Sequence, residues 1–483
     1  MGSSFFKQHP GFIPACSNFS IQYNYASASI AAAIMLSHND QTGEHIVADY
    51  PQPRWAKSVL LGVVFIGSVV GMLTMGYLGD LLGVQRGIVI TNWFMVVGSL
   101  ASALLSWGSS EAIWLVIALS RFVLGIGVGG AYPLSAAKAA EAGKATEDAQ
   151  DAVNRAGRAF FWQGPGSMAP YVLAIPLLKL LPHNNGVTSL QFRLLLGLGA
   201  LPAMVVLLAS MAEGEASASQ RGATPQQLRR QPKEQNLAEK LRNPEHMRAL
   251  VGTAGGWFLF DIAFYGTIMF APNILENIFE GGQTLTSTSL CAAIMAFVGI
   301  VGNVLGLAAL PETGAKMLNV VGFSVSAVLF MLFVVCHLVF KDQHILLFAL
   351  LCFLYVTLYA GPNIATFVLP VMAFPPDVRA TYHGLSAAAA KLGAMVGTLL
   401  FPVLDDAYGV LPVMGLQAVF CTLGAIVSHC CLSDYKHEKL QQEDLEMKHP
   451  DAQRIGVGSD TSPLKENREE NLTVAEENII VSA

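Results

Sequence analysis

One acidic side chain stands alone inside a long apolar stretch of this chain. The run from Val251 to Pro272 contains the segment GTAGGWFLFDIAFYG, and Asp261 is its only charged residue. If the run is a membrane helix, the carboxylate lies far from both ends, where inserting a charge is unfavourable by about 2.5 kcal/mol or more. An acid retained at such a position indicates a functional site.

Two aromatic residues are spaced to act together with this acid. Trp257, Asp261 and Tyr265 follow one another at intervals of four residues, so one face of a helix would carry an indole, a carboxyl group and a phenol. Such a set could hold an oxyanion through neutral donors and exchange a proton with it. Buried tryptophan and tyrosine also serve as packing residues, and that alternative stays open for both aromatic positions.

The composition indicates which solvent surrounds these residues. Of the 483 residues, 53% are hydrophobic and 13% are charged, whereas a soluble globular domain has about 25% charged residues. The chain is therefore expected to be an integral protein of the lipid bilayer. Its net charge is -6 and it has no dense basic patch, so a nucleic-acid partner is not expected.

The cysteines favour neither a disulfide framework nor a metal site. Those in or at the end of apolar runs are Cys291, Cys336, Cys352, Cys421, Cys430 and Cys431. They lack the CxxC or Cys/His spacing of zinc sites. We expect no metal and no cofactor. Since no soluble segment is long enough for a catalytic domain, the chain is not expected to be an enzyme.

Twelve apolar stretches are long enough to cross a bilayer as helices of about 20 residues. They cover approximately residues 17–36, 58–79, 87–106, 112–134, 157–180, 192–212, 249–272, 287–310, 316–340, 344–370, 383–404 and 409–432. The first is the weakest, because Asn18, Gln22 and Asn24 make it partly polar. The tenth contains Gly361 and Pro362, where a kink is expected. The predicted fold is all-α, with twelve transmembrane helices in two pseudo-symmetric six-helix bundles.

The polar segments between the spans set the expected domain limits. These are an N-terminal six-helix bundle at 1–212, a cytoplasmic linker at 213–248, a C-terminal six-helix bundle at 249–432 and a disordered cytoplasmic tail at 433–483. The linker contains seven Lys or Arg residues, whereas the loops at 107–111 and 181–191 contain none. Because cytoplasmic loops carry the excess of Lys and Arg, both the N- and C-termini are expected in the cytoplasm.

A glycine-rich stretch in the fourth span is interpreted as a packing motif. Gly125, Gly127 and Gly130 match GxGxxG, but this pattern binds dinucleotides only when it follows a strand in a βαβ unit. The surrounding sequence, SRFVLGIGVGGAYPLSA, is instead typical of a membrane helix. Glycines at this spacing allow the backbone of a neighbouring helix to approach closely.

The loop after the second span reads GYLGDLLGVQRG and resembles the loop signature of the major facilitator superfamily. By this resemblance, Asp80 would cap or pair with a neighbouring helix end when the cytoplasmic side closes. Arg86 is the one basic residue retained, because Val84 and Gln85 stand where the family usually has basic residues. A tight turn between helices would explain the glycines but not the aspartate.

Five segments in chain order are similar to signatures of the phosphate:proton symporter family of plants and fungi. They are SRFVLGIGVGGAYPLSA, GRAFFWQGPG, GTAGGWFLFDIAFYG, GPNIATFVLP and FPPDVRATYHGLSAAAAKLGAMVG. The resemblance implies a major facilitator fold and transport of phosphate with protons. The phosphate ligands of the family fall on Tyr132, Gln163, Trp257, Asp261, Tyr265 and Asn363.

The chemistry of these residues agrees with that implication. Tyr132, Gln163 and Asn363 come from three further helices and add neutral polar groups, although Gln163 could instead make an interhelical hydrogen bond. A protonated Asp261 would donate a hydrogen bond to a phosphate oxygen, so the proton and the anion would bind cooperatively. Asp261 is therefore the expected proton-coupling residue.

Two cations within the predicted spans could help to neutralise a bound anion. Lys391 lies in the eleventh span and Arg121 in the fourth. A buried cation is stable only when it is paired or hydrogen-bonded. Arg121 is equally suited to tying helices together.

Several acidic residues of the symporters are missing from this chain. Ala131 stands where they have an aspartate before the YPLS stretch, and Ile21 and Asn24 replace the acidic pair of the first helix. Met372 replaces a glutamate between two prolines. The anion ligands are thus kept while much of the proton path is not. Fewer protons per cycle, a different coupling ion and facilitated exchange are all open.

The sequence therefore predicts a secondary active transporter that moves inorganic phosphate with protons by alternating access. We expect a monomer in the plasma membrane, with an internal membrane as the alternative. A carrier of sugar or of another organic or phosphorylated anion is the alternative within transport, and its cavity should contain Lys and Arg or extra Asn and Gln. A phosphate sensor that signals through its tail without turnover is the alternative from another class.

Overall fold

The computed structural model describes residues 9–36, 50–51, 53, 55–142, 149–180, 185–221, 244–279, 285–340, 343–376 and 378–433. The helices of the first half of the chain are α2 (Phe12–Leu36), α3 (Ala56–Leu82), α4 (Val84–Leu104), α5 (Ser110–Glu141), α6 (Ala149–Phe160), α7 (Gln163–Leu180), α8 (Asn185–Gly197) and α9 (Ala200–Arg221). Those of the second half are α11 (Pro244–Leu250), η1 (Val251–Gly255), α12 (Gly256–Phe279), α13 (Leu285–Thr313), α14 (Ala315–Val339), α15 (His344–Leu358), η2 (Tyr359–Asn363), α16 (Ile364–Ala373), α17 (Arg379–Tyr408) and α18 (Val410–Cys431).

Within these described ranges, ten helical segments are long and apolar enough to cross a membrane. The first and fifth predicted spans are not among the ten. They correspond to α2, whose polar residues lower its hydropathy, and to α6 and α7, which are separated by a turn at Phe161 and Trp162. Most polar side chains of α2 are buried and two, Gln22 and Ser29, are partly buried, and the helix packs against α5, α7 and α8. Its polarity therefore faces protein and is compatible with a membrane position.

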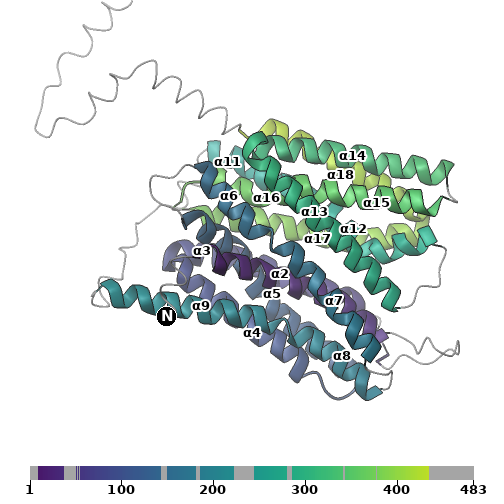
Figure 1. Cartoon of the computed structure of the whole chain (residues 1–483), viewed down its shortest axis with the longest axis horizontal. Helices are drawn as coiled ribbons and strands as arrows, with labels where there is room; N and C mark the ends of the chain where they lie inside the picture. The colour runs from purple at the N-terminus through teal and green to yellow at the C-terminus, as the bar shows by residue number, and fades with distance from the viewer. Residues whose placement is uncertain are drawn as a thin grey trace, which may run out of the picture. The chain divides into compact units, whose positions relative to one another are not determined.

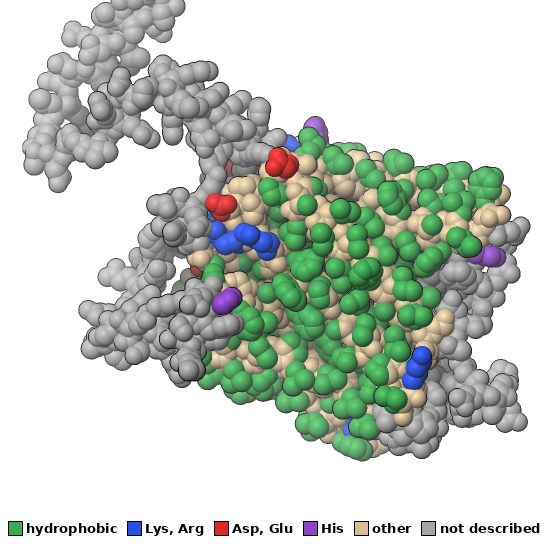
Figure 2. Space-filling view, viewed as in Figure 1, with side chains coloured by type: hydrophobic (Ala, Val, Ile, Leu, Met, Phe, Trp, Pro, Cys, Tyr) green, Lys and Arg blue, Asp and Glu red, His purple; other side chains and the backbone are tan. Residues whose placement is uncertain are grey.

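Stripes of exposed apolar side chains mark the surface that faces lipid. On α4, Trp93, Val97, Leu100 and Leu104 recur every three or four residues and are 38% to 63% exposed. Figure 2 shows a broad hydrophobic face with charged side chains gathered near its ends. An apolar surface of this extent is unfavourable in water, so the chain is a multi-pass membrane protein.

Each half of the chain packs mainly within itself. In the first half α5 packs against α3 and α4, and in the second half α12 packs against α17 and α14 against α18. Figure 1 shows the purple-to-teal helices of the first half beside the green-to-yellow helices of the second. The halves meet where α17 contacts α3 and α5, where α13 contacts α7 and where α16 contacts α6.

The expected domain limits stay predictions. Helix α9 continues to Arg221, beyond the expected end of the first bundle at residue 212, and α11 begins at Pro244. Residues 222–243, which form most of the expected linker, lie outside the described residues. The expected disordered tail lies outside them from residue 434 onward.

The packing interpretation of the glycine-rich stretch is confirmed. A Cβ atom on Gly125 would lie 2.4 Å from the carbonyl oxygen of Val64, and one on Gly127 would lie 2.5 Å from that of Thr91. Both distances are too short for a side chain. The backbones of α3 and α4 therefore press directly against α5 at these glycines.

The expected break in the tenth span is also confirmed. Helix α15 ends at Leu358, the π-helical turn η2 contains Pro362, and α16 continues from Ile364. Proline has no N–H to donate and disturbs the regular ladder of helix hydrogen bonds. The irregular turn places Asn363 in the protein interior, where it is 7% exposed.

Candidate functional site

Asp261 of α12 forms a buried ion pair with Lys391 of α17. The Nζ of Lys391 donates a hydrogen bond to Asp261 Oδ2 at 2.9 Å, and each side chain is 2% exposed. Either charge alone would be strongly unfavourable in such surroundings. The pair as a whole is neutral, and adding one proton or one anion would give it a net charge.

Tyrosines from both halves of the chain surround the lysine of this pair. Lys391 Nζ also donates to the hydroxyl oxygen of Tyr265 at 3.0 Å. It lies 4.3 Å from the ring centroid of Tyr265, 5.1 Å from that of Tyr132 and 5.5 Å from that of Tyr25. These distances are in the range of cation–π attraction. Because Tyr25 and Tyr132 belong to α2 and α5, the cation of the second half lies against aromatic rings of the first.

Gln163 belongs to a network of neutral polar side chains from the first half. Its Oε1 accepts hydrogen bonds from the hydroxyl group of Tyr132 at 3.3 Å and from Gln22 Nε2 at 3.0 Å. Its Nε2 donates to Asn18 Oδ1 at 2.7 Å, and Asn18 Nδ2 donates to Ser135 Oγ at 3.4 Å. The network joins two of the predicted ligands, Gln163 and Tyr132, without adding a charge.

Asn363 is oriented by a second asparagine and does not contact the ion pair. Its Nδ2 donates to Asn303 Oδ1 at 3.2 Å. Asn303 Nδ2 is buried and has no hydrogen-bond partner, which is rare for a buried donor. A Cβ atom on Gly164 would lie 3.2 Å from that nitrogen. The donor therefore lies beside the start of α7, one residue from Gln163.

Trp257 lies in an aromatic layer that consists of Tyr132, Phe160, Trp257, Phe367 and His383. Phe160 of α6 stacks on Phe367 of α16 with ring centroids 4.4 Å apart. Trp257 lies 6.3 Å from Tyr132 and 6.2 Å from Phe367 between ring centroids. The rings thus come from both halves of the chain.

The position of this aromatic layer follows from the two helices that carry the ion pair. Trp257 precedes Asp261 by about one turn of α12, and His383 precedes Lys391 by about two turns of α17. The aromatic layer therefore lies toward the N-terminal ends of both helices. It separates the ion pair from the residues that begin α17.

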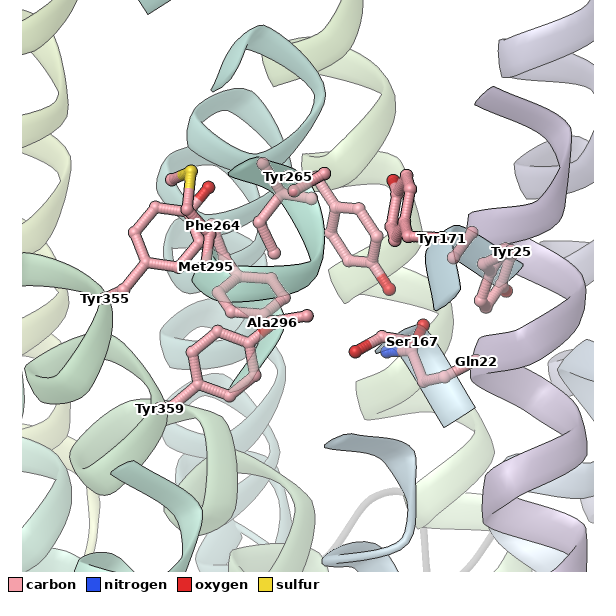
Figure 3. A pocket seen from close by; sticks show the side chains of 13 residues that line it. Gln22, Tyr25, Ser167, Tyr171, Phe264, Tyr265, Met295, Ala296, Tyr355 and Tyr359 are labelled. Carbon is pink, nitrogen blue, oxygen red and sulfur yellow. The ribbon is translucent and has the colours of Figure 1, made fainter. Parts of the chain in front are cut away.

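A cavity lies beside Tyr265, toward the C-terminal end of α12. Its volume is about 60 Å³, enough for several water molecules. Figure 3 shows the labelled side chains that surround it: Gln22, Tyr25, Ser167 and Tyr171 from the first half, and Phe264, Tyr265, Met295, Ala296, Tyr355 and Tyr359 from the second. The described residues of the lining include five tyrosines and no charged side chain, so they offer hydroxyl donors to an anion without a fixed charge.

Arg121 ties helices together and lies outside the contacts of the ion pair. Its guanidinium group donates to the backbone oxygen of Asn24. The Nδ2 of Asn24 donates to the backbone oxygens of Ser20 at 2.9 Å and Gly199 at 3.1 Å, and its Oδ1 accepts from Ser99 Oγ at 2.9 Å. Of the two roles expected for Arg121, these contacts support the structural one.

Asp80 caps the N-terminus of α17. Its Oδ2 accepts hydrogen bonds from Thr381 N at 2.7 Å and Thr381 Oγ1 at 2.6 Å, and its Oδ1 accepts from Ala380 N at 3.3 Å. A carboxylate is stabilised at this end of a helix by unpaired N–H groups and by the helix dipole. Since α3 and α17 belong to different halves, the contact joins the halves at this end. Arg86 lies exposed on α4, outside the contact.

Three of the four positions at which the symporters have acids carry apolar side chains here. Ala131 and Ile21 are buried in the core, and Met372 packs against that core while partly exposed. Asn24 makes the interhelical hydrogen bonds described above. In the part of the chain that the structure describes, no three His, Cys, Asp or Glu side chains gather as a metal site requires.

Several polar residues that surround the predicted ligands were not predicted from the sequence. Asn18 and Gln22 were treated only as residues that weaken the first span. The positions 18, 22 and 25 fall on one helix face, and this spacing is the signal that could have placed them with Tyr25. Tyr355 and Tyr359 of the cavity are likewise four residues apart.

Comparisons with known sequences agree with this architecture. A protein-family model described as "Sugar (and other) transporter" matches residues 12–445. The inorganic phosphate transporter PT2 of Toxoplasma gondii is 32% identical over 418 residues, which cover 86% of this chain and 70% of that protein. The low affinity inorganic phosphate transporter 4 of Lotus japonicus is 31% identical over 392 residues, which cover 71% and 74%.

Solved structures with a similar fold are transporters of the major facilitator superfamily. The proton:xylose symporter XylE bound to 6-bromo-6-deoxy-D-glucose has a TM-score of 0.67 at 16% identity, and the match covers 88% of this chain and 95% of that one. FucP in its outward conformation has a TM-score of 0.60 at 13% identity, with 87% and 98% covered. At these identities the likeness shows the fold.

Proposed function

This chain belongs to the sugar (and other) transporter family within the major facilitator superfamily and is a membrane transporter; we propose that it carries inorganic phosphate with protons by alternating access. Two of its relatives are named inorganic phosphate transporters. The observation that carries the proposal is the buried Asp261–Lys391 ion pair with tyrosines around it.

The charges of the ion pair account for the coupling. A phosphate monoanion bound alone would leave one net negative charge, and a proton bound alone would leave one net positive charge. When both bind, Asp261 takes the proton, Lys391 pairs with the anion, and the site is neutral again. Because a net charge within the membrane is unfavourable, only the empty and the doubly loaded forms change conformation readily.

Neutral donors complete the proposed anion site. Lys391 exchanges its carboxylate partner for a phosphate oxygen, and the protonated Asp261 donates a hydrogen bond to another. The hydroxyl groups of Tyr132 and Tyr265 and the indole N–H of Trp257 can donate to the remaining oxygens. These groups replace the hydration shell of the anion without adding a charge that would hold it permanently.

The two halves are in contact on one side of the ion pair in this conformation. At the N-terminal end of α17 the Asp80 contact joins the halves. A Cβ atom on Gly76 would lie 2.7 Å from the oxygen of Ala380, and one on Gly384 would lie 2.3 Å from that of Met72. The backbones of α3 and α17 thus meet here, while the cavity beside Tyr265 lies in the opposite direction.

We propose that the joined end is cytoplasmic, as the positive-inside bias of the loops predicts. Both chain termini then lie in the cytoplasm, and phosphate enters from the other side through the tyrosine-lined cavity. The plasma membrane is the proposed location. A monomer is the proposed working unit, because one chain supplies the side chains of both halves of the site.

Uptake of radiolabelled phosphate into proteoliposomes tests this function. We expect accumulation above equilibrium when the outside is more acidic than the inside, and only equilibration when the two sides have the same pH. Excess unlabelled xylose should not compete. Uptake of labelled sugar in place of phosphate would support the sugar-carrier alternative, and phosphate binding without uptake would support the sensor.

A further inference from the structure

His383 of α17 is a buried titratable side chain that the proposed phosphate site does not use. It is 0% exposed. Its Nε2 lies 3.0 Å from the backbone oxygen of Phe367. Because a carbonyl oxygen can only accept, Nε2 carries the hydrogen and Nδ1 of the neutral ring is an acceptor. Nδ1 is buried and has no hydrogen-bond partner.

Aromatic rings from both halves of the chain enclose this histidine. Its ring centroid lies 5.5 Å from that of Trp257 and 5.0 Å from that of Phe367, with both rings nearly perpendicular to it. Phe367 in turn stacks on Phe160 of the first half. His383 therefore belongs to the second half but lies in a layer that the first half helps to close.

Among the described residues, no acidic side chain pairs with His383, although the carbonyl oxygen of Phe367 accepts a hydrogen bond from its Nε2. The charged side chains and histidines at this end of α17 and of the elements around it are Asp80, Arg121, Lys138, Glu141, Glu245, His246, Arg248, Asp261, Arg379, Lys391 and His429, and the titratable tyrosines are Tyr77, Tyr132, Tyr265 and Tyr382. Of the acids, Asp80 caps α17 and Asp261 belongs to the ion pair. Glu141 interacts with Arg379. A charged imidazole would thus lie unpaired among apolar rings.

We propose that His383 is a proton-binding site that is accessible only from the cytoplasmic side and whose protonation holds the transporter open to that side. This inference rests on the proposed alternating-access function. Opening at the Asp80 end must separate Phe160 from Phe367, because they belong to different halves, and this exposes His383 to water. Its unpartnered Nδ1 then accepts a proton, and the charged ring cannot return to the apolar layer until the proton leaves.

Protons on the two sides of the membrane consequently have opposite effects on the rate of phosphate uptake. A proton that arrives with phosphate at Asp261 drives uptake, whereas one bound at His383 delays the return of the empty carrier. Since the proton binds the open state and not the closed one, acidification shifts the population toward the open state. Acidification of the compartment that receives phosphate should therefore slow turnover.

Hydrogen exchange of the purified full chain tests the site without requiring phosphate. In the parent, protection of the amides of α16 should fall between pH about 7.5 and about 5.5, the interval over which histidine normally titrates, after correction for intrinsic exchange rates. His383→Gln keeps an N–H donor for the Phe367 oxygen but cannot be protonated. In this variant the protection of the α16 amides should therefore stay the same across the pH interval. His429→Gln, at an exposed position near the end of α18, should behave as the parent.

Equal loss of protection in the parent and in His383→Gln, or no loss in the parent, would overturn the proposal. If His383→Gln does not fold, Phe160→Leu replaces it as the test variant. This change loosens the same layer from the other half, so protection should be lost at a higher pH than in the parent. An unchanged midpoint would then also overturn the proposal.

Phosphate exchange at equal pH and equal concentration on both sides supplies the functional measurement. Acidification should slow exchange in the parent several-fold more than in His383→Gln. An equal slowing in both proteins would overturn the role of His383 while leaving phosphate transport intact. Absence of any phosphate exchange would instead contradict the proposed function, and hydrogen exchange would still decide whether His383 binds the proton.

Discussion

The two halves of the chain contribute unequally to the candidate site. The second half supplies both charges, Asp261 on α12 and Lys391 on α17. The first half supplies the neutral network of Asn18, Gln22 and Gln163. From this difference we infer that the second half couples the proton to the anion, whereas the first half surrounds the anion with polar, uncharged side chains.

Arg121 is a buried cation of the first half with a structural role. Arg121 is engaged by the backbone of Asn24 and does not contact the ion pair. Asn24 and Ala131, which stand where the symporters have acids, leave the first half without a carboxyl group at these two positions. The comparison therefore predicts large effects for changes to charges in the second half and smaller, graded effects elsewhere.

Removing the cation of the ion pair should have the largest effect. Lys391→Met leaves Asp261 without its partner, and breaking a buried ion pair from one side is unfavourable by about 3 to 5 kcal/mol. We expect phosphate uptake to fall by about 100-fold or more. Lys179→Met, at an exposed lysine of α7, is the matched control and should keep normal uptake. Substantial uptake by Lys391→Met would remove the pair from the mechanism.

Loss of single neutral donors should weaken phosphate binding to an intermediate degree. Trp257→Phe, Tyr265→Phe and Asn363→Leu each remove one buried polar group, with an expected loss of about 1 to 3 kcal/mol or about 5-fold to 150-fold in affinity. Phosphate binding by calorimetry in detergent measures the effect. Tyr77→Phe, at an exposed tyrosine of α3, should bind as the parent does. Unchanged affinity in all three variants would place the site elsewhere.

Adding an acid to the first half should make the two halves more alike, because both would then carry a titratable carboxyl group. Ala131→Asp introduces a second titratable group next to Tyr132, so uptake should depend more steeply on the outside pH. Initial rates across a pH series measure the slope, and Ala131→Asn controls for the larger side chain. An identical slope in parent and Ala131→Asp would show that a carboxyl group at this position does not take part in coupling.

Replacing the connection between the halves should have the smallest effect. Residues 222–240 are polar and rich in Lys, Arg and Gln, so a Gly/Ser sequence of equal length should join the halves equally well. Uptake per molecule in the membrane should stay within about twofold of the parent. Complete loss of uptake in protein that reaches the membrane would give the connection a role in the transport cycle.

The helices and the charged residues of the site were predictable from sequence for one physical reason. A bilayer requires long apolar helices and makes any charge within them unfavourable, so both features are conspicuous in the sequence. Asp261 stood out since a charge in an apolar run is unfavourable, and its four-residue spacing to Trp257 and Tyr265 defined one helix face. The same reasoning singled out Lys391. The sequence could not show that these two charges bind each other, because 130 residues separate them.

The neutral part of the site was harder to predict for a physical reason. Amide and hydroxyl groups are tolerated in membrane helices for many purposes, so Gln22 or Asn303 carries no strong signal alone. Their partners lie far along the chain: Gln22 bonds to Gln163, and Asn303 to Asn363. Only the packing of α2 on α7 and of α13 on η2 brings these pairs together.

The central claim is that Asp261 carries the proton that accompanies phosphate, and Asp261→Asn tests it most directly. The amide mimics the protonated carboxyl group, so phosphate binding should persist with little dependence on pH. Uptake of labelled phosphate into proteoliposomes with an acidic outside should then stop at equilibrium, whereas the parent accumulates phosphate beyond it. Accumulation by Asp261→Asn equal to that of the parent would contradict the claim and leave Asp261 with a structural role.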